Sequence, residues 1–218
     1  MTGKYSFRDI STKITDPAGS REQLSRKAVL TRMIGELPEV PWADIEITGW
    51  LSEDDKLPVD YCFAGTPYGQ VLVANTPKGV CYLGLAGGEG ESLFSDFNRR
   101  FGHSLRTERQ TSLQKQALDF LSGKRDGHIA FHLRGTPYQT EIWRRLIRIP
   151  YGKVVSYATL GGDVRNSRAA GTANGRNPVF WIIPCHRAVK SDGGFDRYFW
   201  GEEVKKRLLA WEFANSGD

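Results

Sequence analysis

The pattern of hydrophobic and polar residues becomes regular from residue 59 onwards. Three short apolar segments, Val59–Phe63, Gln70–Asn75 and Val80–Leu85, are separated by turns that contain Pro and Gly. Segments of this length between such turns are typical of strands joined by tight connections, so we expect an antiparallel meander. Apolar residues then recur at helical spacing in two segments, which predicts two amphipathic helices. Their apolar positions are Leu93, Phe97 and Phe101 in the first, and Leu113, Ala117 and Leu121 in the second.

The pattern in residues 1–57 is weaker. These residues are polar, prolines interrupt the short periodic stretches, and the spacing indicates one helix around Ser20–Glu36. We therefore predict three parts: an N-terminal extension of unknown role (1–57), an α/β domain (58–128) and a mostly helical domain (129–218). Strands followed by helices in this order predict the α+β class, with a small antiparallel sheet in the α/β domain.

A strong helix signal opens the third part. Thr136 suits the N-cap, Pro137 suits the first helical position, and Gln139 completes a capping box. Pro150 marks where the helix must have ended. The residues expected on its buried face are Tyr138, Ile142, Leu146 and Ile149.

Two short helices are expected next. Ser156 is placed to cap a helix at Tyr157–Leu160, and Ser167 to cap another at Arg168–Asn174. Such a pair across a tight turn favours a helix-turn-helix. The second helix carries almost no bulky side chains. This composition suits close approach to a flat or narrow partner, and it suits tight packing against another helix equally well.

The net charge of +5 is concentrated in the third part of the chain. From Arg134 to the end there are 14 Lys and Arg against 8 Asp and Glu, whereas the preceding residues are close to neutral. This excess favours a polyanionic partner such as DNA. A merely solvated basic surface explains it about as well.

Composition excludes several classes of protein. No apolar run approaches the roughly 20 residues of a membrane span, and no apolar segment follows Met1, so we expect no membrane partner and no secretion. The three cysteines, Cys62, Cys81 and Cys185, lack CxxC spacing, and the four histidines lack a metal-ligand pattern. We therefore expect no disulfide framework and no metal site. A cytoplasmic location follows, at the nucleoid if the source is bacterial.

The candidate nucleophile is Cys185. It follows an apolar, strand-like run at Val179–Ile183, and a cysteine in such a place is usually an inert core residue. Three neighbours raise the expectation of reactivity. Pro184 stiffens the approach, His186 offers a base, and the positive charge of Arg187 is expected to favour thiolate over thiol.

The last predicted helix, Glu202–Phe213, supplies a carboxylate. Glu212 falls on its apolar stripe, where a charged group must be paired or hydrogen-bonded. Fraying of the helix end into water is the alternative. Lys205 lies seven positions earlier on nearly the same face. The stripe itself consists of Val204, Leu208, Leu209 and Phe213.

Six motifs follow one another between residues 134 and 213. They are Gly135–Gln139, Gly152–Tyr157, Arg168–Gly171, Asn177–Pro178, Pro184–Val189, and the set Lys205, Leu208, Leu209 and Glu212. In this order they closely resemble the O6-alkylguanine-DNA alkyltransferases, also called methylated-DNA–protein-cysteine methyltransferases. The meander at residues 59–85 resembles the amino-terminal domain of that family, which implies an RNase H-like fold there.

The resemblance implies that Cys185 accepts an alkyl group, mainly methyl, from O6-alkylguanine in DNA, irreversibly and once per molecule. A water molecule would link Cys185 to His186, which Glu212 would hold as in a hydrolytic triad. Neither a metal nor a diffusible cofactor would be needed. The other residues with implied catalytic roles are Asn177, which would stabilise the turn before the cysteine, and Tyr157 and Lys205, which would assist departure of the guanine.

For DNA binding, the resemblance implies contact through the minor groove and a flipped-out base, whose place in the stack Arg168 would fill. The helix expected on the DNA comprises Arg168, Ala169, Ala170, Gly171, Thr172, Ala173 and Asn174. The substrate pocket would comprise Pro184, Ala188, Tyr198, Phe199 and Trp200. Trp200 stands where some relatives have glycine, so methyl is expected to be transferred faster than benzyl. The implied partner is double-stranded DNA with O6-alkylguanine, O4-alkylthymine stays open, and a monomer is expected.

Three other functions compete with alkyl transfer. A non-catalytic sensor of alkylated DNA would lack the acceptor cysteine, which is present here. A helix-turn-helix regulator of transcription would explain the basic part and leave the residues around Cys185 unexplained. A thiol hydrolase is disfavoured because no oxyanion-hole motif accompanies the cysteine.

Overall fold

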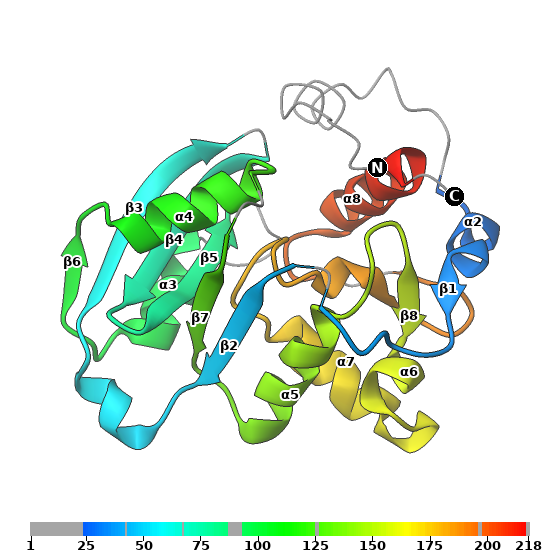
Figure 1. The fold of residues 1–218 in the computed structure, drawn as a ribbon, viewed down its shortest axis with the longest axis horizontal. Helices are drawn as coiled ribbons and strands as arrows, with labels where there is room; N and C mark the ends of the chain where they lie inside the picture. The colour runs from blue at the N-terminus through cyan, green and yellow to red at the C-terminus, as the bar shows by residue number, and fades with distance from the viewer. Residues whose placement is uncertain are drawn as a thin grey trace.

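The computed structural model describes residues 24–41, 43–66, 68–86, 93–124, 127–195 and 198–216 (Figure 1). A six-stranded sheet with the helices α3 (Leu93–Phe101) and α4 (Ser112–Leu121) forms one side of the molecule, and the other α-helices with a small second sheet form the other. The predicted α+β class is therefore confirmed.

The large sheet has the strand order β2-β7-β5-β4-β3-β6. The predicted meander is confirmed, because β3, β4 and β5 pair antiparallel. The sheet as a whole is mixed, however, since β2–β7, β5–β7 and β3–β6 pair parallel. The strands are β2 (Ile45–Gly49), β3 (Val59–Thr66), β4 (Gly69–Thr76), β5 (Gly79–Leu85), β6 (Arg106–Glu108) and β7 (Ile129–Leu133).

The two predicted amphipathic helices are confirmed as α3 (Leu93–Phe101) and α4 (Ser112–Leu121). α4 covers the near face of the sheet in Figure 1 and α3 the far face, and both contact β4 and β5. All seven residues of β5 are buried as a result. A strand covered on both faces reads as a continuous apolar run, which is what Val80–Leu85 shows.

A polar cluster is buried within this side of the molecule. His132 on β7 is fully buried, and its ring lies between the hydroxyl of Thr76 (Nδ1 to Oγ1, 2.8 Å) and the carboxylate of Asp54 (Nε2 to Oδ2, 3.0 Å). Asp54 belongs to the short helix η1 (Ser52–Lys56) and also pairs with Lys78. Trp50 stacks on the imidazole at 4.6 Å. We call Thr76, His132, Asp54 and Lys78 the sheet cluster.

The helix after the large sheet is α5 (Pro137–Leu146), and its capping box is as predicted. Thr136 Oγ1 accepts from the backbone N–H of Gln139, whose side chain accepts from the N–H of Thr136. Ile142 and the later apolar positions are buried. Tyr138 is 40% exposed, so its predicted place on the buried face is wrong. It occupies the first turn, which projects beyond the packed part of the helix.

The helices α6 (Tyr157–Gly161) and α7 (Ser167–Gly175) follow, joined by η2 (Val164–Asn166). Ser156 caps α6 as predicted, accepting from the N–H of Thr159. The predicted cap Ser167 is wrong: it is the first residue inside α7, and its hydroxyl donates to the carbonyl of Val164. The preceding turn already places Ser167 in helical geometry, so the helix starts one residue early.

A small parallel sheet that the sequence did not predict joins β1 (Met33–Ile34), β8 (Val154–Ser156) and β9 (Ala188–Val189) in the order β1-β8-β9. Before it, α2 (Arg26–Thr31) buries Val29 among a few apolar side chains of the other elements. The helix expected at Ser20–Glu36 is thus shorter within the described residues, and its positions 20–23 lie outside them. The remaining elements are η3 (Cys185–Arg187) and α8 (Glu202–Asn215).

The strands cross both boundaries of the three-part division. β2, which precedes residue 58, and β7, which follows residue 128, are both members of the large sheet. β1 joins the opposite side of the molecule (Figure 1). The division into domains at 57/58 and 128/129 therefore stays a prediction, and the large sheet extends across both boundaries.

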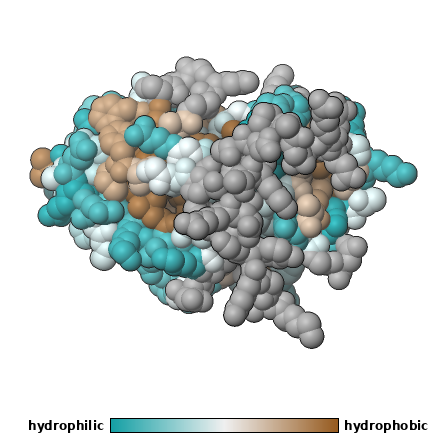
Figure 2. Space-filling view, turned by 90° about the horizontal axis from the view of Figure 1, so that it is seen from above, coloured by the Kyte–Doolittle hydropathy of each residue, from teal (hydrophilic) through white to brown (hydrophobic). Residues whose placement is uncertain are grey.

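On the part of the face in Figure 2 that is not drawn in grey, hydrophobic surface gathers on the left and is bordered by hydrophilic surface. Within the described ranges, no helix combines the length and the apolar composition that crossing a bilayer requires.

Candidate active site around Cys185

Cys185 begins the single turn of η3, and only 3% of its surface is exposed. The approach from Val179 is an irregular loop, so the predicted strand at Val179–Ile183 is wrong. Val179 makes one bridge to Leu83, after which the chain turns, and Trp181 adopts a positive φ of 61°. An apolar run alone does not distinguish a buried loop from a buried strand.

Asn177 holds this loop together. Its side-chain amide donates to the carbonyls of Val179 (2.9 Å) and Ile183 (2.8 Å), and its Oδ1 accepts from the N–H of Val179 (3.0 Å). The side chain is buried and replaces the backbone bonds that a strand would have supplied. Asn177 thereby fixes both ends of the run from Val179 to Ile183, which leads directly to Pro184.

His186 and Glu212 form a buried pair next to the cysteine. The ring Nε2 lies 2.8 Å from Glu212 Oε1, and both side chains are fully buried. Burial lowers the pKa of His186, opposed by the charge of Glu212, so the ring is neutral and Nε2–H donates. Nδ1 then carries a lone pair, and it has no hydrogen-bond partner among the residues described. The prediction that Glu212 is paired is confirmed, and the fraying alternative is wrong.

Arg187 points towards the carboxylate and away from the thiol. Its Nε and Nη2 each donate to Glu212 at 2.9 Å, and Nη1 donates to the carbonyl of Ile149 at 2.7 Å. Burial alone would raise the pKa of Glu212, but Arg187 and His186 outweigh it and hold that pKa at about 2. The predicted role of Arg187 in favouring the thiolate is therefore corrected, because its guanidinium pairs with Glu212. The apolar periodicity of the last helix could not reveal this partner.

The thiol of Cys185 has a different partner. Its Sγ lies 3.5 Å from the hydroxyl of Tyr198. Burial raises the pKa of Cys185, while Tyr198, Asn177 and Lys205 act in the opposite direction. Burial prevails, so the resting group is the thiol. A reaction at this sulfur must therefore remove a proton.

Lys205 and Tyr157, both expected to assist departure of the guanine, belong to α8 and α6. Lys205 is fully buried on α8 and donates to the carbonyl of Ala188 at 2.7 Å, with Nζ 5.8 Å from the ring of Tyr198. Tyr157 begins α6 and is half-buried. The carbonyl of Ala188, a residue expected in the substrate pocket, is thus bonded to Lys205.

The residues expected on the DNA divide between two faces of α7. Arg168, Ala169 and Thr172 are exposed, and Gly171 is half-buried. Three others face inwards: the buried set is Ala170, Ala173 and Asn174. The indole of Trp143 donates to the carbonyl of Ala173 at 3.0 Å. Small residues therefore serve tight packing on one face and leave a low profile on the other.

Asn174 was expected on the DNA and instead contacts the active-site turn. It is 5% exposed, and its amide donates to the carbonyl of Cys185 at 3.2 Å. The exposed helix face and the thiol-bearing turn are thus connected through one side chain. Spacing along a short helix of small residues could not tell the inner face from the outer one.

The expected pocket residues are largely buried. Pro184, Ala188, Tyr198 and Trp200 are buried, and Phe199 is half-buried. Trp200 contacts the ring of Phe180 edge-on at 5.8 Å. Sequence reasoning missed Phe180, whose only signal was an aromatic residue inside the apolar run before the cysteine.

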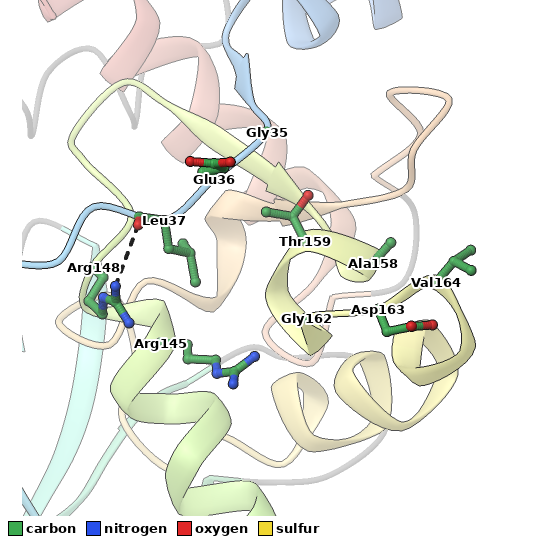
Figure 3. Close-up of a pocket in the computed structure, with 10 residues that line it drawn as sticks. All are labelled: Gly35, Glu36, Leu37, Arg145, Arg148, Ala158, Thr159, Gly162, Asp163 and Val164. Carbon is green, nitrogen blue, oxygen red and sulfur yellow. Dashed lines mark hydrogen bonds between the residues drawn. The ribbon is translucent and has the colours of Figure 1, made fainter.

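No group of three or more His, Cys, Asp or Glu side chains is arranged to hold a metal ion in the described part of the chain. A shallow groove of about 450 Å³ lies elsewhere, between residues 35–37 and the helices α5 and α6 (Figure 3). Arg145 and Arg148 extend into it from one side and Asp163 from the other. None of the residues expected in the active site lines this groove.

Comparison with known proteins supports the family resemblance. Residues 137–214 match the family model described as 6-O-methylguanine DNA methyltransferase, DNA binding domain. The chain is 35% identical over 147 residues to the inducible methylated-DNA–protein-cysteine methyltransferase of Bacillus subtilis, covering 64% of this chain and 82% of that one. It is 34% identical over 165 residues to the methylated-DNA–protein-cysteine methyltransferase of Methanosarcina barkeri, covering 71% and 98%.

Solved structures with a similar fold come from the same family. The Mycobacterium tuberculosis OGT in complex with DNA superposes with a TM-score of 0.57 at 26% identity, over 71% of this chain and 93% of that one. The Mycobacterium tuberculosis O6-methylguanine methyltransferase superposes with a TM-score of 0.58 at 27% identity, over 73% and 95%. The match in sequence over most of the length of the relatives and the match in fold show that this chain belongs to the methylated-DNA–protein-cysteine methyltransferase family.

Proposed function

We propose that this protein repairs DNA by direct reversal, transferring the alkyl group of O6-alkylguanine to Cys185 in a single, irreversible turnover. The observation that carries the proposal is the geometry around one buried thiol. Cys185 adjoins a neutral His186 that is fixed through Nε2 by Glu212, while Nδ1 keeps a lone pair. A proton acceptor beside a thiol is what nucleophilic transfer requires.

The proposed reaction removes the thiol proton and then moves one alkyl group from O6 to sulfur. The Cys185 thiol gives its proton to His186 Nδ1 through a water molecule, and Glu212 stabilises the resulting imidazolium. Sulfur attacks the alkyl carbon, the S–C bond forms, and the C–O6 bond breaks with its electron pair left on the guanine. The guanine takes up a proton as it leaves, and Tyr157 and Lys205 assist by polarising the base. The thioether is stable, so the protein acts once.

DNA binding is proposed to use α6 and α7 as a helix-turn-helix. The exposed face of α7 offers small side chains that suit the minor groove, and exposed Arg168 at its start fills the place of the flipped-out base. The positive excess after residue 134 supports attraction of a polyanion. We also propose that the large sheet with α3 and α4 is the RNase H-like domain of the family.

Selectivity is proposed to depend on the buried aromatic residues beside the thiol. Trp200 packs against Phe180, which leaves less room for a large alkyl group, so methyl is transferred faster than benzyl. The proposed substrate is O6-alkylguanine in double-stranded DNA, with O4-alkylthymine as a second base to test, and the protein acts as a monomer in the cytoplasm. Equal rates from O6-methyl and O6-benzyl substrates would contradict the role of Trp200.

The test is intact-protein mass spectrometry after incubation with a duplex that contains O6-methylguanine. One added methyl group, about 14 Da for a covalent alkyl intermediate that is not released, is expected on the wild type and not on Cys185→Ala. Selective binding of the lesion without any mass change would favour the sensor function. Sequence-dependent binding without lesion selectivity would favour the regulator.

A further inference from the structure

One contact of the sulfur is not used by the proposed relay. Cys185 Sγ lies 3.5 Å from the Tyr198 hydroxyl, within hydrogen-bonding range for sulfur. Both residues are buried, with 3% and 7% of their surfaces exposed. Bulk water therefore does not compete strongly for either group, and a hydrogen bond between them matters more than at a surface.

The tyrosine is held in place from two directions. Its carbonyl accepts from the N–H of Gly201 at 3.0 Å, and its ring faces the ammonium of Lys205 at 5.8 Å. Lys205 is itself fixed by the carbonyl of Ala188. The ring orientation is thus set by packing and by a cation–π contact, which leaves the hydroxyl directed at sulfur.

Two other polar side chains near the sulfur, Asn177 and Lys205, donate hydrogen bonds to backbone carbonyls. Both amide hydrogens of Asn177 are donated to the carbonyls of Val179 and Ile183. The ammonium of Lys205 donates to the carbonyl of Ala188, and Asn177 and Lys205 both act to lower the pKa of Cys185. The Tyr198 hydroxyl lies within hydrogen-bonding distance of Sγ and carries a hydrogen that can turn towards it.

We propose that Tyr198 is a catalytic residue of the transfer, whose hydroxyl accepts from the Cys185 thiol at rest and donates to the thiolate during attack. This inference rests on the proposed function and goes beyond lining a pocket. A hydroxyl both accepts and donates, so the same contact serves both states by rotation of one O–H bond. A charge-assisted bond to the thiolate is stronger than the bond to the thiol.

The proton count is consistent with this role. The thiol proton goes to His186, and Tyr198 keeps its own proton throughout. Burial, followed by the proximity of Cys185 and Glu212, raises the pKa of Tyr198 well above its ordinary value, so the hydroxyl stays protonated when the thiolate forms. After transfer the sulfur is a thioether, which has no hydrogen to donate and is a weak acceptor.

The experiment compares wild type with Tyr198→Phe in the full chain, using a duplex with O6-methylguanine. We expect the second-order rate of methyl transfer near pH 7 to fall by about 10- to 100-fold, at or below the range for loss of one preorganised donor. The rising limb of the pH–rate profile should move to higher pH, because the thiolate loses its donor. Affinity for unmodified duplex should not change. Tyr61→Phe, in the ring cluster on β3, is the matched control.

A second measurement does not depend on the folding of the variant. Wild type in which tyrosines are replaced by 3-fluorotyrosine keeps its shape and has a stronger hydroxyl donor, so the pH–rate profile should move to lower pH. The same replacement in Tyr198→Phe should give no such movement. Transfer by Tyr198→Phe within twofold of wild type, at an unchanged pH profile, would overturn this inference alone. Absence of transfer by wild type would overturn the proposed function, and this inference with it.

Discussion

Two buried histidines, one on each side of the molecule, have similar surroundings but differ in how many of their ring nitrogens are hydrogen-bonded. His132 in the sheet cluster and His186 beside Cys185 both bond a carboxylate through Nε2, at 3.0 and 2.8 Å. Burial lowers the pKa of both rings. At Nδ1 they differ: His132 meets the Thr76 hydroxyl, whereas His186 meets no described group.

The difference separates a histidine with both ring nitrogens bonded from one that keeps a basic nitrogen without a described partner. In the sheet cluster each polar atom of the ring has a partner, so the network stabilises the packing of η1 against β4 and β7. Beside Cys185 the buried Nδ1 costs stability while it stays without a partner. That cost is consistent with a base kept ready for a proton. Residue types alone would rank Thr76–His132–Asp54 as the more convincing triad, but both ring nitrogens of His132 are already bonded.

The largest expected effect is on the reactive histidine. His186→Gln keeps a donor for Glu212 and removes the basic nitrogen. The rate of methyl transfer should fall by about 10²- to 10⁴-fold, the usual contribution of a general base. Rapid-quench measurement of transfer from an O6-methylguanine duplex checks this. A rate within threefold of wild type would show that His186 takes no proton.

Removal of the buried cation should cost the most stability. Arg187→Met leaves the buried Glu212 carboxylate without its bidentate partner, so the free energy of unfolding should fall by about 3–5 kcal/mol. Lys78→Met is the matched change in the sheet cluster. Because the Lys78 side chain is 44% exposed, about 1 kcal/mol or less is expected there. Urea titrations of both variants decide whether the two clusters differ as described.

Acid should lower the free energy of unfolding through the buried carboxylate of Glu212. The pKa of Glu212 is about 2 in the folded protein against an ordinary 4.5, so its stabilisation is complete above pH 4.5 and is lost as the pH falls towards 2. The pKa difference corresponds to about 3 kcal/mol. Asp54 has a pKa of about 2 as well, so the measurement is made in Asp54→Asn. Unfolding free energy that stays constant between pH 4.5 and 3 in that variant would contradict the expectation.

The smallest effect on transfer is expected for the structural histidine. His132→Gln should lower the free energy of unfolding by about 1–3 kcal/mol, the cost of leaving buried polar partners unsatisfied. Transfer by the folded variant should stay within twofold of wild type. A large loss of transfer in the folded variant would contradict this expectation, because it would mean that the sheet cluster affects the reactivity of Cys185.

Local signals predicted much of the fold. The capping box at Thr136 and the meander after Val59 depend on neighbouring residues and were correct. The small parallel sheet was missed because its strands are only two or three residues long and come from distant parts of the chain. Ser167 failed as a cap because the turn before it is already helical.

The site was predictable in its residue types and less so in its contacts. A carboxylate on an apolar stripe had to be paired, and Glu212 is. The partner could not be read from spacing, because Arg187 and His186 approach it from another element. Likewise, nothing in the sequence around Tyr198 marks its hydroxyl as the neighbour of the sulfur of Cys185, which lies thirteen positions earlier in the chain.

The pairing of β1 with β8 has a consequence for how the chain reaches its final state. Met33 aligns with Val154, and Arg32 donates to the carbonyl of Phe213 and the hydroxyl of Ser216, although most of the chain lies between these partners. Contacts of such high sequence separation form slowly, because a long loop must close before they contribute. During synthesis, Arg32 and Met33 therefore form these contacts only after their distant partners have been made. The side of the molecule that bears Cys185 is completed only when the end of α8 has left the ribosome, and both ends of the described chain then close on the same strand pair.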